Sequence, residues 1–161
     1  MKNTALGVDI GNVIINNRLN DKEKLDEKGY AALPFVEGAF DALKELNTQF
    51  KNEVFLISKC TEWAQGQILN WLETHDFYTK TGISAKNVYF VRERHEKDAV
   101  CKKLGITHFI DDRLEVLSHM TETVPHLILF QPDQSEVDEF VKFLPKVTRV
   151  EDWEEVIKKI K

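Results

Sequence analysis

The sequence is poor in the residues that cross-link a chain or break up its secondary structure. Its two cysteines, Cys60 and Cys101, lie far apart and form no CxxC motif, so neither a disulfide framework nor a zinc knuckle is indicated. Seven glycines and four prolines among 161 residues are too few for a collagen-like or low-complexity chain. So little cysteine favours a reducing compartment, and we expect a cytoplasmic protein.

Long hydrophobic runs are also missing. The apolar stretch 5–15 is interrupted by Asp9 and Asn12 and has no small-residue cleavage site after it, so it does not look like a signal peptide. No run approaches the roughly 18 apolar residues of a membrane span, and we expect no membrane partner. Basic residues are in the minority: 27 acids against 22 bases give a net charge of −5, which opposes broad attraction to nucleic-acid phosphates but allows a local cationic pocket.

What the sequence does contain is a regular alternation of short β-rich runs with segments of helical periodicity. The β-rich runs are too short and too rich in β-branched and aromatic residues to be helices. Alternation of this kind is typical of a parallel sheet covered by helices, so the predicted fold class is α/β, a three-layer sandwich with a mostly parallel, Rossmann-like sheet and helices on both faces. The predicted strands are Ala5 to Val8, Val54 to Ile57, Val88 to Val91, His108 to Ile110, Leu127 to Phe130 and Val147 to Val150.

Apolar residues at helical spacing predict the helices between these strands. We expect Pro34 near the first turn of the first core helix, Gly105 as a left-handed residue after a helix that ends at Leu104, and Asp152 as the cap of a helix that starts at Trp153. No repeat or Gly-rich linker divides the chain, so 1–161 is predicted to be one domain. The periodic segments are 36–46, 68–72, 100–104 and 137–144.

The segment 16–29 does not join the alternation. It is dense in Asn, Asp, Glu and Lys, and its apolar anchors are Leu19 and Leu25. We interpret it as a solvated loop or short helix, and as the one candidate for a small lid over a site.

Polar side chains come at the ends of three predicted strands. Asp9 follows the first, Ser58 follows the second, and the pair Asp111-Asp112 follows the fourth. The carboxyl ends of parallel strands open on one edge of the sheet, which is where ligands bind in this class of fold. We therefore expect these groups to meet at one site.

Several buried carboxylates in one place repel each other and lose hydration, which costs several kcal/mol for an isolated ion. A hard divalent cation removes that cost, and Mg²⁺ prefers carboxylate, carbonyl and water oxygens, shared with a substrate phosphate. The sequence thus predicts a Mg²⁺ site. Next to Asp9, the loop around Asn12 is suited to present backbone N–H groups to an anion, with Gly11 allowing close approach.

The same positions carry a resemblance to the haloacid dehalogenase superfamily of phosphohydrolases, from about Leu6 to Arg113. Asp9-Ile10-Gly11-Asn12-Val13 resembles the first motif, Phe55-Leu56-Ile57-Ser58 the second and Ile110-Asp111-Asp112-Arg113 the fourth, while Lys97 in 96–106 looks like the lysine of the third. Each motif is weak alone. Together, in order and each after the expected element, they are a specific signal.

The resemblance implies a Mg²⁺-dependent phosphatase in which Asp9 attacks phosphorus and forms an aspartyl-phosphate. It implies that Ser58 binds phosphoryl oxygens and that Lys97 links nucleophile and phosphate. The implied metal ligands are Asp9, the carbonyl of Gly11 and a carboxylate of the pair, preferably Asp112, with Asp111 in support. Substrate contacts are expected from Gly11, Asn12, Ser58 and Lys59.

Two departures from the family pattern bear on function. The usual second Asp, the general acid and base, is replaced by Gly11, and such a group is typically worth about 10² to 10⁴ in rate. Too few residues lie between Val13 and Val54 for a large cap, and the capless pattern suits an open site. An alternative function is therefore a binding or regulatory protein with the same fold and little turnover. A receiver domain of the response-regulator kind is a third hypothesis, although its acidic pair normally follows the first strand.

Several side chains have plausible structural roles instead. Ser58 is equally suited to cap the helix that begins near Glu62, and Lys59, Lys102 and Lys103 rival Lys97 for the phosphate. Arg92, Arg94 and His95 form either an anion-recognising group or a plain basic loop. The expected ligand is a phosphorylated small molecule or nucleotide, with a nucleic-acid end or a phosphoprotein as further options.

Overall fold

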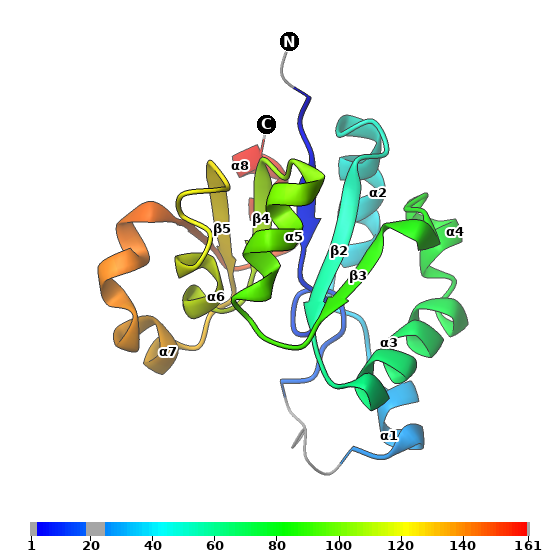
Figure 1. Ribbon diagram of the computed structural model, residues 1–161. Coiled ribbons are helices and arrows are strands. Elements are labelled where there is room, and N and C mark those ends of the chain that lie inside the picture. Colours follow the sequence, from blue (N-terminus) through cyan, green and yellow to red (C-terminus); the bar gives the residue numbers. More distant parts are fainter. Residues whose placement is uncertain (1–2, 19–24, 161) are drawn as a thin grey trace.

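The computed structural model describes residues 3–18 and 25–160, and its centre is one parallel sheet (Figure 1). The strand order is β3-β2-β1-β4-β5-β6, and every neighbouring pair is parallel. The order reverses direction between β1 and β4, the position at which such sheets open a ligand crevice. The strands are β1 (Leu6–Val8), β2 (Val54–Lys59), β3 (Val88–Val91), β4 (His108–Asp111), β5 (His126–Phe130) and β6 (Thr148–Val150).

Side chains alternate between the two faces of the sheet and build a hydrophobic core on each. Leu56 of β2 faces one core and Phe55 the other. The ring of Phe109, in the same core as Phe55, lies very close to the backbone of Gly7 in β1. A Cβ built on Gly7 would lie 2.5 Å from that ring. Glycine at this position therefore lets β1 lie directly beside the β4 aromatic ring.

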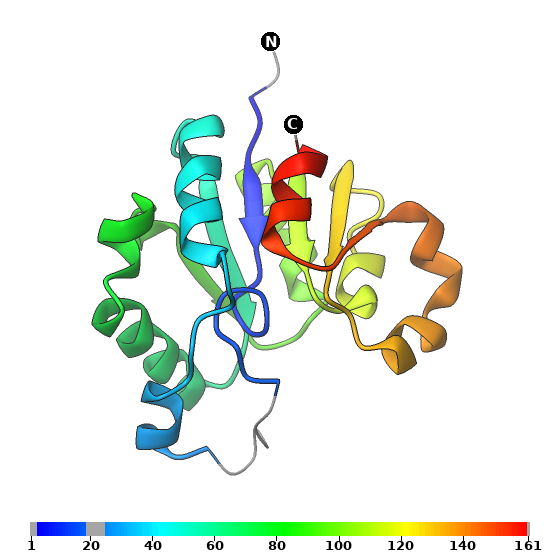
Figure 2. The same ribbon diagram turned by 180° about the vertical axis from the view of Figure 1, so that it is seen from behind.

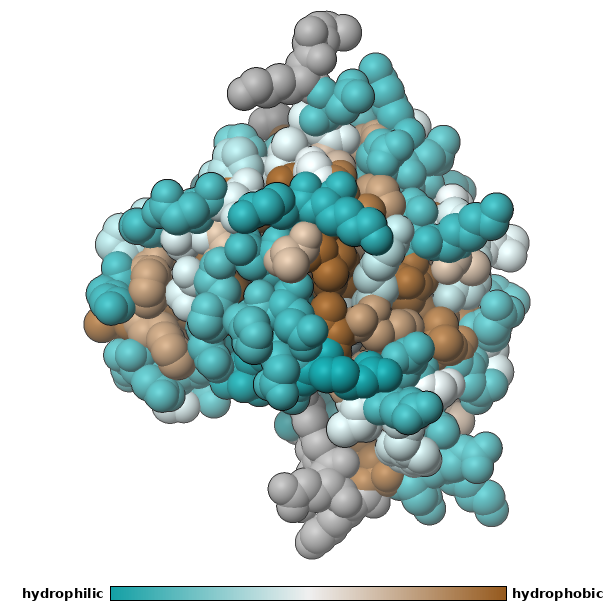
Figure 3. All heavy atoms as spheres, in the orientation of Figure 1, coloured by the Kyte–Doolittle hydropathy of each residue, from teal (hydrophilic) through white to brown (hydrophobic). Residues whose placement is uncertain are grey.

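Helices cover both faces, which makes the three-layer α/β sandwich that the alternation predicts (Figures 1 and 2). One core is closed by α2 (Ala39–Gln49), α3 (Glu62–Thr74), α4 (Phe77–Thr81) and α8 (Trp153–Ile160), the helices in front in Figure 2 or beside them. The opposite core is closed by α5 (Glu96–Leu104), α6 (Leu114–Ser118) and α7 (Gln134–Glu139). Figure 3 shows apolar side chains reaching the surface beside α5, over β2 and β3. The short elements are α1 (Glu27–Ala31), η2 (Ala85–Asn87) and η3 (Val141–Lys146).

All six predicted strands are present, but β2 and β4 extend past the carboxyl ends of their predicted runs. Ser58 and Asp111, expected just after a strand, are still paired in the sheet. Ser58 pairs with Phe90, one position before the last pair of β2, and Asp111 pairs with Leu129 at the end of β4. Polar residues at a sheet edge can keep backbone pairing when the neighbouring strand extends as far, which a single strand's hydrophobicity does not reveal.

The predicted helices are present, but some of them begin or end at other residues than expected. Asp152 accepts from the Glu155 N–H at 2.8 Å and Gly105 has φ 68°, both as predicted. The prediction for Pro34 is wrong, because the core helix starts only after Gly38, which has φ 81°. The Pro34 carbonyl accepts from the Asn16 N–H at 2.8 Å, outside any helix.

The periodic segment 137–144 is also not one helix. It is split into α7 and the 3₁₀ turn η3, which contains Pro145. Pro145 has no N–H to donate, so a regular α-helix is not maintained there.

The segment 16–29 falls partly outside the described residues. Of the part that is described, α1 begins with Asp26 as its cap, whose carboxylate accepts from the Gly29 N–H at 2.7 Å. The helix packs on α3, where the Tyr30 ring meets the Trp63 indole edge-on with 6.2 Å between centroids. The lid role stays a prediction. No helix within residues 3–18 and 25–160 is long and apolar enough to cross a lipid bilayer.

Candidate active site

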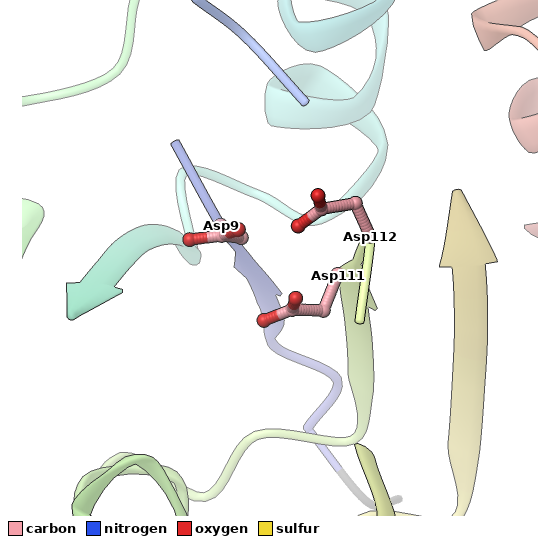
Figure 4. A group of neighbouring side chains, drawn as sticks. All are labelled: Asp9, Asp111 and Asp112. Atoms are coloured by element: carbon pink, nitrogen blue, oxygen red, sulfur yellow. The ribbon is translucent and has the colours of Figure 1, made fainter. Parts of the chain in front are cut away.

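Three carboxylates converge where the strand order reverses (Figure 4). Asp9 follows β1 and Asp111 ends β4, its partner in the sheet, with Asp112 next in the chain. Each offers an oxygen within 4.8 Å of the others. The two acidic positions predicted from distant parts of the sequence therefore do meet, and the reason is that β1 and β4 are hydrogen-bonded neighbours.

A single buried lysine joins two of these carboxylates. The Nζ of Lys97, in the first turn of α5, lies 3.0 Å from Asp9 Oδ1 and 2.9 Å from Asp111 Oδ2. Burial by itself lowers the pKa of the Lys97 ammonium, but the attraction of Asp111 and Asp9 outweighs it and raises that pKa above its ordinary value. Lys97 is therefore charged, and it bridges the two strands.

The rival lysines are placed differently. Lys59 ends β2 with an exposed side chain, and Lys102 and Lys103 are exposed in the last turn of α5, while only 2 % of Lys97 is exposed. Among the four candidates, the geometry thus puts Lys97 at the acidic group. The substrate contact expected of Lys59 stays a prediction.

One lysine does not balance the three carboxylates. Burial is the largest cause that raises the pKa of both Asp111 and Asp112, and the negative charge of Asp9 is the next. Both carboxyl groups thus hold protons more tightly than usual, the expected response to surplus negative charge in a desolvated place. A divalent cation fits this site, because it replaces those protons and supplies the missing positive charge.

The hydrogen bonds distinguish the two aspartates of the doublet. Asp111 uses Oδ2 for Lys97, and its Oδ1 accepts from the Arg113 N–H at 3.1 Å. Both oxygens of Asp111 therefore have a partner, whereas Asp9 uses Oδ1 for Lys97 and its side chain also meets that of Asp112. This favours Asp9 and Asp112 as the carboxylates that face a cation, with Asp111 holding the lysine.

The loop after Asp9 is a tight turn. The Ile10 carbonyl accepts from the N–H groups of Val13, Ile14 and Ile15, and Asn12 takes φ 62°. The Asn12 N–H donates to the Ile15 carbonyl at 2.7 Å, so it is engaged inside the turn.

Beside Asn12, a side chain at Gly11 would meet open space. A Cβ built on Gly11 has no atom within 4 Å. Position 11, where the resemblance predicts that the usual second Asp is missing, therefore has room for a side chain.

Ser58 is at the same edge of the sheet, one strand further along. It is buried near the end of β2, which pairs with β1. The cap of α3 is Thr61, whose hydroxyl accepts from the Ala64 N–H at 3.2 Å. Ser58 therefore does not cap α3. The helix begins at Glu62, four residues after Ser58, and Thr61 is its cap.

The basic loop after β3 is bound mostly to protein groups. Arg92 donates to the Cys60 carbonyl and to Gln65, and Arg94 pairs with Glu115 at 3.4 Å. Arg113 also lies near Glu115, at 3.6 Å. These contacts agree with local pairing more than with recognition of an anion.

Sequence reasoning missed three residues that act on this site. Arg18 lies close enough to offset a small part of the rise in the pKa of Asp112, and it donates to the Asn12 carbonyl at 3.3 Å. Tyr30 lies near Asp9, and its pKa is raised to about 12 by burial, then by Cys60 and Asp9. Glu136 binds the segment after Asp112. Arg18 lies six residues past Asn12 in a segment of mixed charge, so nothing in the sequence separates it from the lysines that follow it, and the other two depend on tertiary packing.

Comparisons with known proteins give relatives by structure alone. No protein-family model and no curated protein sequence matches the chain. A D,D-heptose 1,7-bisphosphate phosphatase from B. bronchiseptica, solved with magnesium and phosphate, is similar at 13% identity and TM-score 0.68, over 98% of this chain and 97% of that one.

Two further structures have the same fold. A haloacid dehalogenase-like hydrolase from Burkholderia xenovorans LB400 is 13% identical with TM-score 0.65, over 97% of this chain and 95% of that one. An apo phosphoserine phosphatase is 15% identical with TM-score 0.58, over 99% of this chain and 100% of that one. With six parallel strands in the order 3-2-1-4-5-6 and acidic residues at the switch point, the chain has the fold of the haloacid dehalogenase-like hydrolases.

Proposed function

We propose that this protein is a Mg²⁺-dependent hydrolase of phosphate monoesters that works through an aspartyl-phosphate on Asp9. The observation that carries the proposal is the group of three carboxylates around one buried lysine at the switch point of the sheet. The solved phosphatases of the same fold support it.

The metal would be held by Asp9 and Asp112, with the Gly11 carbonyl as the expected third protein ligand. Mg²⁺ takes oxygen ligands and keeps several waters, so two carboxylates and a carbonyl suffice. When bound, it neutralises charge on the phosphoryl oxygens and so lets an anionic nucleophile approach an anionic substrate.

The reaction then has two steps at Asp9. A carboxylate oxygen forms a bond to phosphorus while the bond from phosphorus to the ester oxygen breaks, and the alcohol leaves after taking up a proton. Water next attacks the phosphorus of the aspartyl-phosphate, which releases inorganic phosphate and frees the carboxylate. Phosphoryl transfer needs mainly positioning and charge stabilisation, and both are offered by fixed groups on strand ends.

Lys97 and Ser58 would position the phosphate. Lys97 holds Asp9 through Oδ1, which leaves the other oxygen for attack, and its ammonium also draws the phosphate charge. Ser58, at the end of the neighbouring strand, is placed to donate its hydroxyl to a phosphoryl oxygen. Lys59 and the turn at Asn12 would form the rim where substrate enters.

Gly11 limits which substrates are hydrolysed well. Without a carboxylic acid there, we expect esters of alcohols with a low pKa to be hydrolysed best, because such leaving groups need little protonation. We propose a phosphorylated small molecule or nucleotide as the substrate class, and the cytoplasm as the compartment, where the two free thiols Cys60 and Cys101 stay reduced. A binding protein with little turnover is the alternative that the assay must separate.

The test is hydrolysis of p-nitrophenyl phosphate, whose leaving group needs almost no acid. We expect turnover that requires Mg²⁺, that stops with EDTA and that is lost in Asp9→Asn. Asp41→Asn, an exposed carboxylate on α2, is the matched control and should retain activity. If Mg²⁺ and inorganic phosphate bind but no phosphate ester is turned over, the binding function replaces the enzymatic one.

A further inference from the structure

The segment that carries Asp112 is held by a carboxylate from another part of the chain. Glu136 Oε1 accepts from the Leu114 N–H at 2.8 Å, and its Oε2 accepts from the Glu115 N–H at 2.8 Å. Leu114 and Glu115 are the first two residues of α6, which starts two positions after Asp112. Glu136 itself belongs to α7, beyond β5, and is buried with 7 % exposed.

This contact does what a local helix cap ordinarily does. The first N–H groups of a helix have no partner within the helix and need an acceptor. The residue at the cap position is Arg113, whose side chain is cationic and makes no cap hydrogen bond. Asp111 takes the Arg113 N–H and Glu136 takes the next two, so carboxylates bind three successive N–H groups after Asp112.

Glu136 is buried without a salt bridge among the described residues. A buried carboxylate normally needs a positive partner, and here the N–H groups of α6 supply the stabilisation. An uncharged acceptor would satisfy the same N–H groups locally. The remote, bidentate acceptor does something more, because it fixes the backbone of 113–115 relative to α7 and therefore to the end of β5.

We propose that Glu136 is a positioning residue for the metal site, which sets the direction of the Asp112 carboxylate through the segment 113–115. The inference rests on the proposed function, since it concerns the Mg²⁺ that Asp9 and Asp112 would hold. Groups that orient metal ligands from behind typically change metal affinity or activity by about 10- to 100-fold when they are replaced. Glu136 therefore contributes to Mg²⁺ affinity without touching the metal.

The direct test is Mg²⁺ binding to the whole protein, measured by isothermal titration calorimetry well below the unfolding temperature. Glu136→Gln keeps one acceptor oxygen and nearly the same shape, and we expect its dissociation constant for Mg²⁺ to rise by about 10-fold. Glu136→Ala removes both acceptors and should weaken binding further. Glu139→Gln, an exposed carboxylate on the same helix α7, is the control and should bind Mg²⁺ as the wild type does.

A kinetic measurement separates positioning from simple stabilisation. In Glu136→Gln the Mg²⁺ concentration for half-maximal turnover should rise in step with the dissociation constant, while kcat at saturating Mg²⁺ returns close to that of the wild type. A cap that only stabilises the fold would lower the melting temperature and leave Mg²⁺ affinity unchanged, and that result overturns the inference. If Glu136→Ala does not fold, Glu136→Gln alone decides the question.

The two proposals fail in different ways. If the wild type binds no Mg²⁺ and hydrolyses no ester, the proposed function is wrong. If the wild type binds Mg²⁺ and Glu136→Gln binds it equally well, the function stands and the role of Glu136 is wrong.

Discussion

Charged side chains meet in two different ways in this molecule. At the carboxyl edge of β1 and β4, Lys97 faces Asp9 and Asp111 with almost no exposure. On the surface of α8, Lys158 pairs with Glu154 at 3.5 Å with most of both side chains exposed. The surface pair is balanced one to one, whereas the buried group has three carboxylates for one lysine.

The buried group and the surface pair differ in what they contribute to stability. An exposed pair of one helix turn contributes a few tenths of a kcal/mol, and solvent screens it. A buried group with surplus charge is costly to fold, as the raised pKa values of Asp111 and Asp112 indicate. Under the proposed function, a Mg²⁺ ion would offset this surplus charge. We therefore expect the buried group to respond strongly to mutation, pH and Mg²⁺, and the surface pair to respond weakly.

The largest effect is expected from Lys97→Met. Removal of the lysine leaves Asp9 and Asp111 buried without their partner, so the free energy of unfolding at pH 8 should fall by about 3 to 5 kcal/mol. Urea denaturation measures this. The loss should shrink at pH 5, where the carboxylates protonate more readily, and an equal loss at both pH values would contradict the ionic explanation.

Gly11→Asp adds a fourth carboxylate to the buried edge and restores the missing general acid. Because a Cβ at Gly11 meets no atom within 4 Å, the variant should fold. With an alkyl phosphate, a poor leaving group, we expect kcat to rise by about 10²-fold, against a small change with p-nitrophenyl phosphate. An equal response to both substrates would mean that another group already supplies the proton.

The pH dependence of stability should come from Asp112 between pH 7 and 8. Burial first, then Asp9, raises the pKa of Asp112 to about 9 from 3.8, so the metal-free folded state binds a proton here that the unfolded chain does not. The free energy of unfolding should therefore fall as pH rises, by about 1 kcal/mol over that unit.

Two comparisons isolate this effect. His108, whose pKa burial and His126 lower to about 4 from 6.5, is mostly neutral in both states above pH 7, and its small contribution there has the opposite sign, a slight rise in stability with pH. Saturating Mg²⁺ should abolish the decline, because it replaces the proton, and Asp112→Asn should be flat with or without Mg²⁺. A decline that persists in Asp112→Asn would assign it to another group.

The smallest effect is predicted for the surface pair. Lys158→Met should change the free energy of unfolding by less than about 0.5 kcal/mol, with no dependence on Mg²⁺. A loss as large as that of Lys97→Met would remove the distinction between the two regions.

Much of this arrangement was predictable from the sequence. The six strands and their parallel direction follow from short apolar runs between helical segments, and the positions of Asp9 and Asp111 follow from their place after those runs. The convergence at one edge is then a property of any parallel sheet. The strand limits at Ser58 and Asp111 were missed, because they depend on how far the neighbouring strands β3 and β5 extend.

Other features had no local signal. The stripe 137–144 has the periodicity of one helix, but Pro145 follows it directly, and the structure divides the stripe between α7 and η3. Glu136 has the appearance of a surface acid in an acidic segment, and its burial against α6 depends on the packing of α7. Tyr30 near Asp9 likewise depends on how α1 lies on α3.

The sequence by itself determined which chemical groups this protein can bring to a strand edge, because hydrophobic periodicity dictates where each strand ends and the next residue must face solvent or ligand. Only the tertiary structure decided which of those groups contact one another. It brings Lys97, rather than Lys59, Lys102 or Lys103, to Asp9 and Asp111, and no local pattern could decide this because the contacts join residues 88 and 14 positions apart in the chain.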